Sequence, residues 1–262
     1  MEFKTAFKNI SSGDLQSRLS ELGVRVPPES SSEVSPEKLD SLLRRALADL
    51  DTAAKQTNWI SPIVLSGRYE VFDFTKGYDP SRKLRFPYGW GRYDEDRVGM
   101  YNAEFFKNGV EPRTIHMGVD LGAPAGTSVF APIAARLYAT EFRGAEGDYG
   151  GTIILKADAV KNNGLALFLL FGHLSRASLK LAESVECFHA GDLLGWVGEK
   201  HENGGWNPHL HLQLSWLEPI AVDLPGAVNA SNRSLACAIF PDPSVYLQQA
   251  WAGWPTLAAT LA

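Results

Sequence analysis

Cysteine is scarce in this chain, and an excess of basic charge is absent from it. Cys187 and Cys237 are the only two cysteines and form no CxxC motif, so we expect two buried free thiols rather than a disulfide or a cysteine-bound metal. The 25 basic and 30 acidic residues give a net charge of −5, whereas a nucleic-acid-binding surface is basic. We therefore expect no nucleic-acid partner.

Long apolar runs are also absent. The longest, residues 165–171, has the length of a strand and falls well short of a membrane span. The first nine residues carry no apolar stretch of signal-peptide length. We therefore expect no membrane partner and a cytoplasmic location, and the sequence does not indicate an oligomeric state.

What the sequence does contain is typical of a globular, β-rich protein. Its 262 residues are 45% hydrophobic, enough to bury a core without disulfides. The 24 glycines and 15 prolines indicate many turns. Helical signals are confined to the first 60 residues and the tail. We predict a helix over Asp14–Leu22, a linker over Pro27–Glu33, a helix from Ser35-Pro36 to Asp51 with Ser35 as N-cap, and a short helix near Pro243–Trp251.

Short β-type runs separated by Gly and Pro turns follow one another from residue 113 to about residue 224. These runs cover residues 128–130, 135–138, 152–155, 165–171, 193–197 and 210–216. Helices and strands do not alternate, which argues against a doubly wound α/β fold. We expect four parts: a helical N-terminal extension (1–60), an aromatic and Gly-rich segment that packs on the next domain (61–112), a β-rich domain (113–224) and a C-terminal extension (225–262).

Four of the six histidines lie in three short motifs. His209 and His211 alternate with leucines in His-Leu-His-Leu-Gln-Leu, the period-2 pattern of a half-buried strand. Both imidazoles therefore project from one face, roughly 6.6 Å apart at the backbone. Two polar residues on a solvated face explain this motif by itself equally well.

His116 and Asp120 form the second motif. Four residues of straight strand span roughly 13 Å, too far for one metal ion, so we expect a bend at Gly118 to bring the two side chains together. Zinc hydrolases use three protein ligands and keep a fourth position open. His116, Asp120 and one histidine of the HxH pair make such a set, although spacing does not say which one. The other histidine and His173 of the third motif, Gly172-His173-Leu174-Ser175, remain for proton transfer.

In chain order the motifs are His116–Asp120, Gly172–Ser175 and His209–His211, and together they resemble those of the lysostaphin-type (LytM-like) zinc metallopeptidases. The resemblance spans about residues 113–216 and includes the flanks Gly118–Thr127, Gly191–Gly195 and Gly205–His211. It implies a mainly β (β-rich α+β) fold in which a largely antiparallel sheet carries a narrow groove with one zinc ion at its floor. It also implies that His116, Asp120 and His211 bind zinc and that His173 and His209 serve catalysis.

The function that the resemblance implies is a zinc metalloendopeptidase that cuts peptide bonds next to Gly or Ala. Most such enzymes are exported to cut cross-links of bacterial cell walls, whereas we see no export signal here. One alternative is a non-enzymatic LytM-like module that binds or regulates a cytoplasmic partner. Another is a non-haem iron oxygenase, which also uses two histidines and a carboxylate but has no need for His173 or His209. Trp90, Tyr93, Tyr149 and Trp206 are candidates for the groove wall, with packing in the core or in loops as the alternative. Trp206 is the strongest candidate because it lies three residues before His209.

Overall fold

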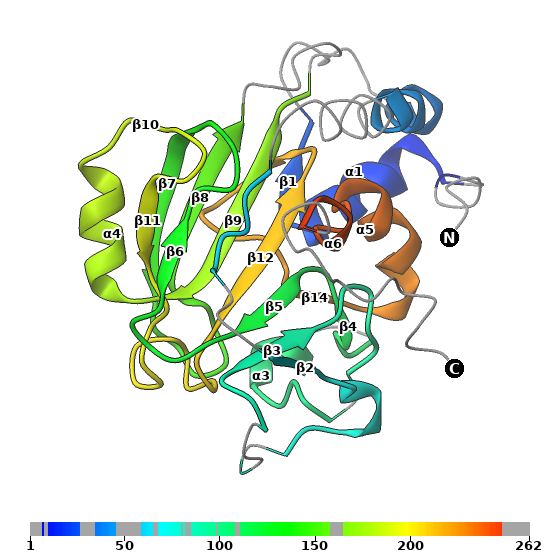
Figure 1. Ribbon diagram of the computed structural model, residues 1–262. Helices are drawn as coiled ribbons and strands as arrows, with labels where there is room; N and C mark the ends of the chain where they lie inside the picture. Colours follow the sequence, from blue (N-terminus) through cyan, green and yellow to red (C-terminus); the bar gives the residue numbers. More distant parts are fainter. Residues whose placement is uncertain are drawn as a thin grey trace.

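The centre of the computed structural model is an eight-stranded sheet (Figure 1). The structure describes residues 7, 10–26, 35–45, 59–64, 68–79, 81, 85–97, 99–107, 111–157 and 165–247. In spatial order the strands are β10 (Cys187–Phe188), β7 (Ala135–Arg143), β8 (Gly150–Ala157), β9 (Leu167–Leu174), β12 (His209–Ser215), β5 (Val119–Gly122), β3 (Tyr88–Gly91) and β2 (Tyr69–Val71). Neighbours are antiparallel except β2 and β3, so the predicted β-rich fold with a largely antiparallel sheet is confirmed.

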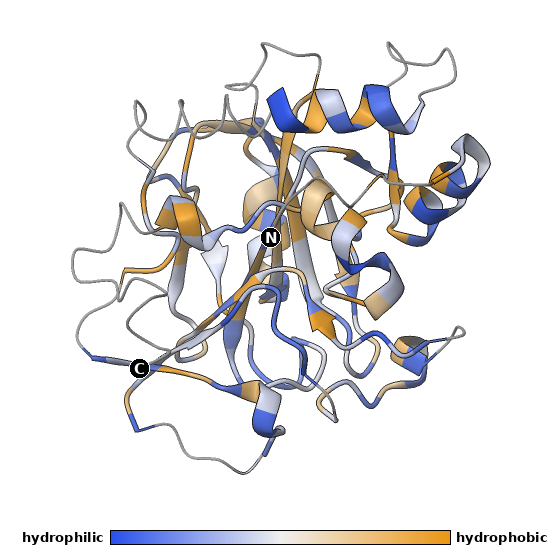
Figure 2. Ribbon diagram, turned by 90° about the vertical axis from the view of Figure 1, so that its right-hand side faces the viewer, coloured by the Kyte–Doolittle hydropathy of each residue, from blue (hydrophilic) through white to orange (hydrophobic). Residues whose placement is uncertain are grey.

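The middle of the sheet forms the core. Every residue of β9 is buried, as its continuous apolar run predicts for a strand covered on both faces. Its neighbours β8 and β12 are buried along nearly their whole length. Each of the six predicted β-type runs contains a strand, and strands in the middle of the molecule are largely hydrophobic (Figure 2).

Three two-stranded sheets flank the large one. They pair β1 (Val24–Arg25) with β13 (Glu218–Pro219), β6 (Ser128–Phe130) with β11 (Leu193–Trp196), and β4 (Ile115–His116) with β14 (Ala227–Val228). The pair of β4 and β14 holds one of the candidate histidines, His116, beside the large sheet.

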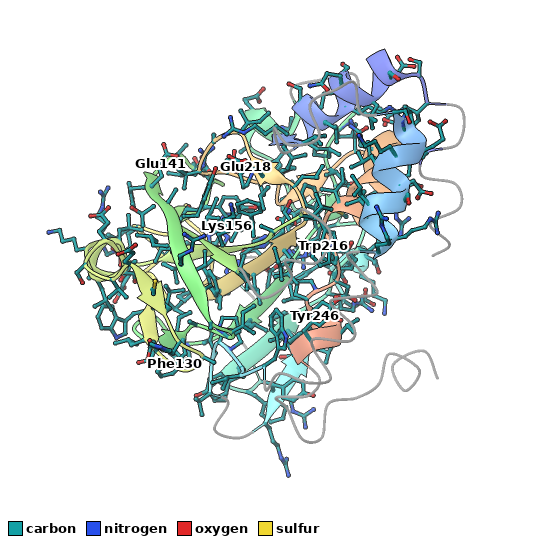
Figure 3. The ribbon with its side chains drawn as sticks, turned by 90° about the horizontal axis from the view of Figure 1, so that it is seen from above. Phe130, Glu141, Lys156, Trp216, Glu218 and Tyr246 are labelled. Carbon is teal, nitrogen blue, oxygen red and sulfur yellow. The ribbon has the colours of Figure 1, made fainter. Side chains whose placement is uncertain are left out.

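Helix α4 lies at one end of the molecule and α1 at the other, while the short α3 lies beside β3 (Figures 1 and 3). The helices are α1 (Ser12–Glu21), residues 36–45, α3 (Glu104–Lys107), α4 (Arg176–Glu183), α5 (Arg233–Ile239) and α6 (Ser244–Leu247), with short 3₁₀ turns η3 (Phe74–Lys76) and η5 (Ala230–Asn232). Ser11 and Ser35 cap the first two through side-chain bonds from backbone N–H groups three residues on. The predicted N-cap Ser35 is thus confirmed. Among the described residues no helix is long and apolar enough to cross a membrane.

The N-terminal helices pack on the C-terminal part of the chain. Leu15 and Leu19 of α1 are at most 2% exposed. Arg18 donates to the Ser231 carbonyl oxygen and Glu21 accepts from Asn232. Whether residues 1–60 separate from the rest stays a prediction, as do the other predicted domain boundaries. The predicted linker, and the ends of the predicted helices after residues 45 and 247, lie outside the described residues.

The prediction for the two cysteines is half wrong. Both are free thiols, but Cys187 is exposed and Cys237 is only partly buried. Cys187 lies in β10, a two-residue strand at the edge of the sheet, where no neighbour covers its outward side chain.

Candidate metal centre

A bend at Gly118 brings His116 and Asp120 together, as the sequence predicts. His116 ends β4, Asp120 lies in β5, and the two residues that connect these strands, Met117 and Gly118, belong to neither. The bend needs glycine because a Cβ at position 118 lies 2.5 Å from His211 Cε1 and 2.7 Å from the Leu212 carbonyl oxygen. No real Cβ contact is that short, so a side chain here displaces His211.

Strand β12 brings the third residue to the same point. Its register places His211 opposite Asp120 of β5 on one side and opposite Gly172 of β9 on the other. His209 and His211 share one face of the strand, while the intervening leucines are fully buried in the core. The predicted strand and its shared histidine face are therefore confirmed, but the prediction of a half-buried strand is wrong, because His211, Gln213 and Ser215 on that face are buried too.

Three ligand-type atoms converge from these strands. His116 Nε2 lies 3.0 Å from His211 Nδ1 and 3.2 Å from Asp120 Oδ1, and the latter two are 3.0 Å apart. All three side chains are buried. We call His116, Asp120 and His211 the ligand cluster.

The far atom of each ligand-cluster side chain has its own protein partner. His116 Nδ1 lies 2.9 Å from the Arg92 carbonyl oxygen, and His211 Nε2 lies 3.1 Å from Gln213 Oε1. Both partners are acceptors, so these ring nitrogens carry the protons and the inward nitrogens carry lone pairs. Asp120 Oδ2 accepts a hydrogen bond from Arg97 Nη1 at 2.6 Å, and Asp120 Oδ1 faces the inward nitrogens of the two histidines.

The cluster therefore gathers three electron-rich atoms with no proton between them, an arrangement that a cation stabilises. Zinc binds histidine nitrogen and carboxylate oxygen at about 2.0–2.2 Å in tetrahedral geometry, which places ligand atoms roughly 3.3–3.6 Å apart. The observed separations of 3.0–3.2 Å lie slightly below that range. The donor set thus fits zinc with a fourth position left open.

His173 and His209 lie beside the cluster, with ring centroids 4.2 Å apart. His173 Nδ1 donates to the Asn203 carbonyl oxygen at 2.8 Å, and His209 Nδ1 donates to that of Asn207 at 2.7 Å. In both rings Nε2 is thus the nitrogen with the lone pair. We call these two residues the histidine pair.

The backbone of His173 adopts a conformation that residues other than glycine rarely adopt. Its φ is +64°, in the left-handed region. Hydrogen bonds on both sides hold it there: its N–H donates to the Tyr149 carbonyl oxygen, and its own carbonyl oxygen accepts from Gly198. The turn directs the ring away from the core packing of β9 and toward His209.

Burial keeps these histidines neutral. It lowers the pKa of His116 to about 4, the pKa of His209 below its ordinary value and the pKa of His173 well below it. Burial by itself raises the pKa of Asp120, but His116 and Arg97 more than offset this and hold it well below its usual range. At neutral pH the site therefore offers neutral imidazoles and a carboxylate, the forms that bind metal ions and accept protons.

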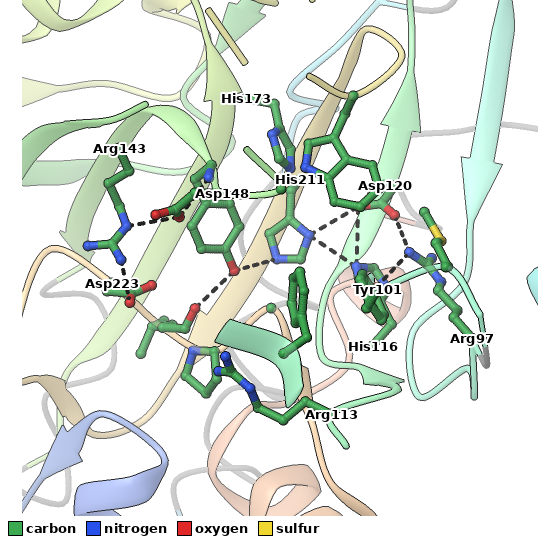
Figure 4. Close-up of a pocket in the computed structure, with 18 of the residues that line it drawn as sticks. Arg97, Tyr101, Arg113, His116, Asp120, Arg143, Asp148, His173, His211 and Asp223 are labelled. Carbon is green, nitrogen blue, oxygen red and sulfur yellow. Dashed lines mark hydrogen bonds and ion pairs between the residues drawn. The ribbon is translucent and has the colours of Figure 1, made fainter. Parts of the chain in front are cut away.

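A cavity of about 410 Å³ lies over both groups. One end carries charge: Arg143 bonds to Asp148 and Asp223, and burial raises the pKa of Asp223 to about 6 despite Arg143 (Figure 4). The other end carries Arg97 and Tyr101, and His211 lies between the two (Figure 4). A site of this size accommodates a short stretch of extended peptide.

Of the four aromatic residues considered for the groove wall, two line the cavity and two do not. Tyr149 and Trp206 line the cavity, as expected. Trp90 and Tyr93 do not: Trp90 packs in the core at 3% exposure, and the Tyr93 hydroxyl donates to the Phe240 carbonyl oxygen.

All five histidine and carboxylate side chains lie in one stretch of sequence that has known relatives. Residues 114–223 match peptidase family M23. This M23 segment contains the three motifs in order, so the resemblance to lysostaphin-type peptidases is confirmed. The assignment of individual ligand and catalytic roles stays a prediction.

Solved structures similar to this chain include three peptidases. A zinc-containing peptidase from Vibrio cholerae is 19% identical over 43% of this chain and 32% of that chain, with a TM-score of 0.31. The catalytic domain of the antimicrobial peptidase lysostaphin from Staphylococcus simulans is 20% identical over 52% and 98%, with a TM-score of 0.32. The catalytic domain of the prophage-encoded M23 protein EnpA from Enterococcus faecalis is 20% identical over 57% and 94%, with a TM-score of 0.35.

The matched region spans about a third of the length of the Vibrio cholerae peptidase. A comparison with curated proteins finds no match to this chain.

Two residues whose side chains bond directly to the ligand cluster were missed from the sequence. Gln213 continues the alternation of His209 and His211 on the same face, and that signal was available. Arg97 stands in the charged run Asp94-Glu95-Asp96-Arg97, which is typical of a solvated loop, and it lies before the M23 segment. Nothing in the sequence distinguishes it from a surface arginine.

Proposed function

We propose that this chain is a zinc-dependent endopeptidase that cuts peptide bonds next to Gly or Ala. The match to a peptidase family and the ligand cluster support a metallopeptidase. The observation that carries the proposal is the convergence of three acceptor atoms within 3.2 Å of one another, beside the histidine pair and under an open cavity.

In this proposal the ligand cluster holds the ion through His116 Nε2, Asp120 Oδ1 and His211 Nδ1. A bound zinc ion supplies a Lewis acid and lowers the pKa of water to about 7. The histidine pair supplies the groups that zinc does not. One imidazole accepts the proton of the attacking water at Nε2. The other stabilises the oxygen on which negative charge develops, and it does so as a donor only once its own Nε2 has taken up a proton. Their Nδ1 atoms are anchored to the backbone, so each presents Nε2 in a fixed direction.

The preference for Gly or Ala rests on the family resemblance. The rings of Tyr149 and Trp206 narrow the cavity near the histidine pair, which favours residues with little or no side chain at the cut. The charged end with Arg143, Asp148 and Asp223 supports a peptide with polar or charged ends as substrate. Cell-wall peptides and peptides of cytoplasmic origin both meet this description.

The test is hydrolysis by the full-length chain loaded with zinc. Pentaglycine, an Ala-Gly peptide, a peptide with bulky residues throughout and peptidoglycan fragments are incubated with it, and the products are identified by mass spectrometry. We expect cuts at Gly or Ala in the first two. The matched variants are His173→Ala and His189→Ala, because His189 is 86% exposed and lies outside the cavity. Only the first should lose activity.

Two outcomes contradict the proposal. Cleavage only beside bulky residues refutes the specificity. Zinc uptake with tight peptide binding but no cleavage refutes the enzyme and favours the binding module. Cleavage of glycine peptides without any action on peptidoglycan keeps the proposal and directs the search to other peptides.

A further inference from the structure

Residues 92–97 lie before the M23 segment but line β4 as a neighbouring strand does. The Asp94 N–H donates to the carbonyl oxygen of His116, and the His116 N–H donates to that of Glu95, at 2.8 and 3.0 Å. The Arg97 N–H donates to the Thr114 carbonyl oxygen at 2.9 Å. We call residues 92–97 the support segment.

The side chains of two ligand-cluster residues, His116 and Asp120, form hydrogen bonds with the support segment. His116 Nδ1 reaches the Arg92 carbonyl oxygen at 2.9 Å, and Asp120 Oδ2 accepts from Arg97 Nη1 at 2.6 Å. Both contacts are made by the atom that faces away from the cluster centre. The support segment therefore fixes the direction of each inward atom.

Arg97 is itself held firmly. It is 1% exposed, and its guanidinium donates to Glu95 Oε2 at 3.0 Å and to the Tyr101 hydroxyl at 3.2 Å. The Phe74 ring lies 4.8 Å from its Cζ. A planar group fixed by this many partners cannot swing with Asp120, so it orients the carboxylate rather than follows it.

The backbone leaves room for this arrangement at Gly91. A Cβ there lies 2.7 Å from Arg97 Nη2 and 3.0 Å from Asp120 Oδ2. Gly91 is paired with Asp120 in the sheet, so the guanidinium reaches the carboxylate across a position without a side chain.

From these contacts we infer that Arg97 is a positioning residue for the metal: by occupying Asp120 Oδ2 it restricts Asp120 to ligation through Oδ1 alone. Carboxylates bind metals through one or both oxygens, and a second oxygen here fills the position that the substrate or water needs. The inference rests on the proposed role of the ligand cluster. It adds to that role a residue outside the M23 segment.

The test compares Arg97→Gln and Arg97→Lys with the wild-type full chain. Zinc affinity is measured by competition with a chromophoric chelator, and cobalt(II) is bound in place of zinc because its visible bands weaken as the coordination number rises. The matched control is Arg233→Gln. Arg233 forms two bonds of 2.8 Å to Asp94 of the same segment and, within the described part of the chain, bonds to no residue of the ligand cluster. Thermal unfolding without metal reports any damage to the fold.

We expect Arg97→Gln to weaken zinc binding by about 10–100-fold, the usual effect of losing a contact behind a metal ligand, and to weaken the cobalt bands. Arg97→Lys keeps the positive charge but loses the forked guanidinium. Its zinc affinity should lie between those of Arg97→Gln and the wild type, and this value tests the inference if Arg97→Gln does not fold. Arg233→Gln should bind both metals as the wild type does.

Wild-type affinity and unchanged cobalt bands in both Arg97 variants overturn the inference while the ligand cluster stands. Equal weakening in Arg233→Gln also overturns it, because the effect is then general damage to the segment. A wild-type chain that takes up no zinc refutes the ligand cluster itself and this inference with it.

Discussion

The ligand cluster and the histidine pair hold their side chains in different ways. Each cluster residue is fixed from behind by a side chain or a carbonyl group, and its inward atom points at two other acceptors. Each histidine of the pair is tied to a carbonyl oxygen of the loop over residues 203–207. His209 Nε2 remains 3.7 Å from Asp120 Oδ1, beyond hydrogen-bonding distance.

In the proposed function this difference separates metal binding from proton transfer. Mutually repelling acceptors 3.0–3.2 Å apart need a cation, whereas a neutral imidazole anchored through Nδ1–H is free to accept a proton at Nε2 and to return it afterwards. The following predictions test whether the two groups really respond differently.

The largest effect is expected at the ligand cluster. His116→Ala removes one of three protein ligands, so metal analysis of the purified chain should fall from close to one zinc per chain to nearly none. Hydrolysis should be lost with it. The exposed His189→Ala variant controls for loss of a histidine as such and should keep its zinc. Full zinc occupancy in His116→Ala would show that His116 is not a zinc ligand.

The next effect concerns rate alone. His173→Ala leaves the ligand cluster intact, so zinc content should stay close to one per chain. The rate should fall at least about a hundredfold, because acid–base groups contribute about 10²–10⁴-fold and an oxyanion donor about 10²–10³-fold. Metal analysis and peptide hydrolysis on the same sample check both values. Full activity in His173→Ala contradicts a catalytic role for His173, and loss of zinc from this variant contradicts its separation from the ligand cluster.

A smaller effect on binding is expected from the support behind His211. Gln213→Leu removes the nearer acceptor of the His211 Nε2–H bond and leaves the Tyr149 hydroxyl at 3.4 Å, and zinc affinity should fall about 10–100-fold. At saturating zinc the rate should recover most of the wild-type value. Ser215→Ala, two residues further on the same strand, is the control and should change neither. A rate that stays low in saturating zinc assigns Gln213 to the chemistry instead.

The site should be least sensitive to changes at the far end of the molecule. Leu19 is 1% exposed on α1, and Leu19→Ala should lower the free energy of unfolding by about 2–5 kcal/mol. Below the new unfolding temperature, zinc content and rate per folded chain should match the wild type. Denaturant unfolding and metal analysis test this. Loss of zinc in folded Leu19→Ala couples the N-terminal extension to the metal centre.

The sequence predicted the parts of this site that repeat a simple pattern. The alternation around His209 and His211 fixes their shared face, and Gly118 marks the bend that His116 and Asp120 require. The six β-type runs likewise carry apolar or alternating side chains that only a strand buries well.

What escaped prediction depends on contacts between distant segments. Strand β3 reads Tyr-Gly-Trp-Gly, and glycine weakens any strand pattern; it forms because Gly89 packs against Gly122 of β5. The burial of Arg97 depends on Glu95 and Asp120 as partners for its charge. No local pattern encodes such a pairing.

His209 and His211 lie two residues apart on one strand, and the proposed function gives them different tasks. Zinc content measured beside hydrolysis rate for His209→Ala and His211→Ala separates these tasks. We expect His211→Ala to lose both zinc and activity, while His209→Ala keeps about one zinc per chain and loses at least about a hundredfold in rate. Loss of zinc from His209→Ala together with full zinc in His211→Ala contradicts the assignment of ligand and catalytic histidine within this strand.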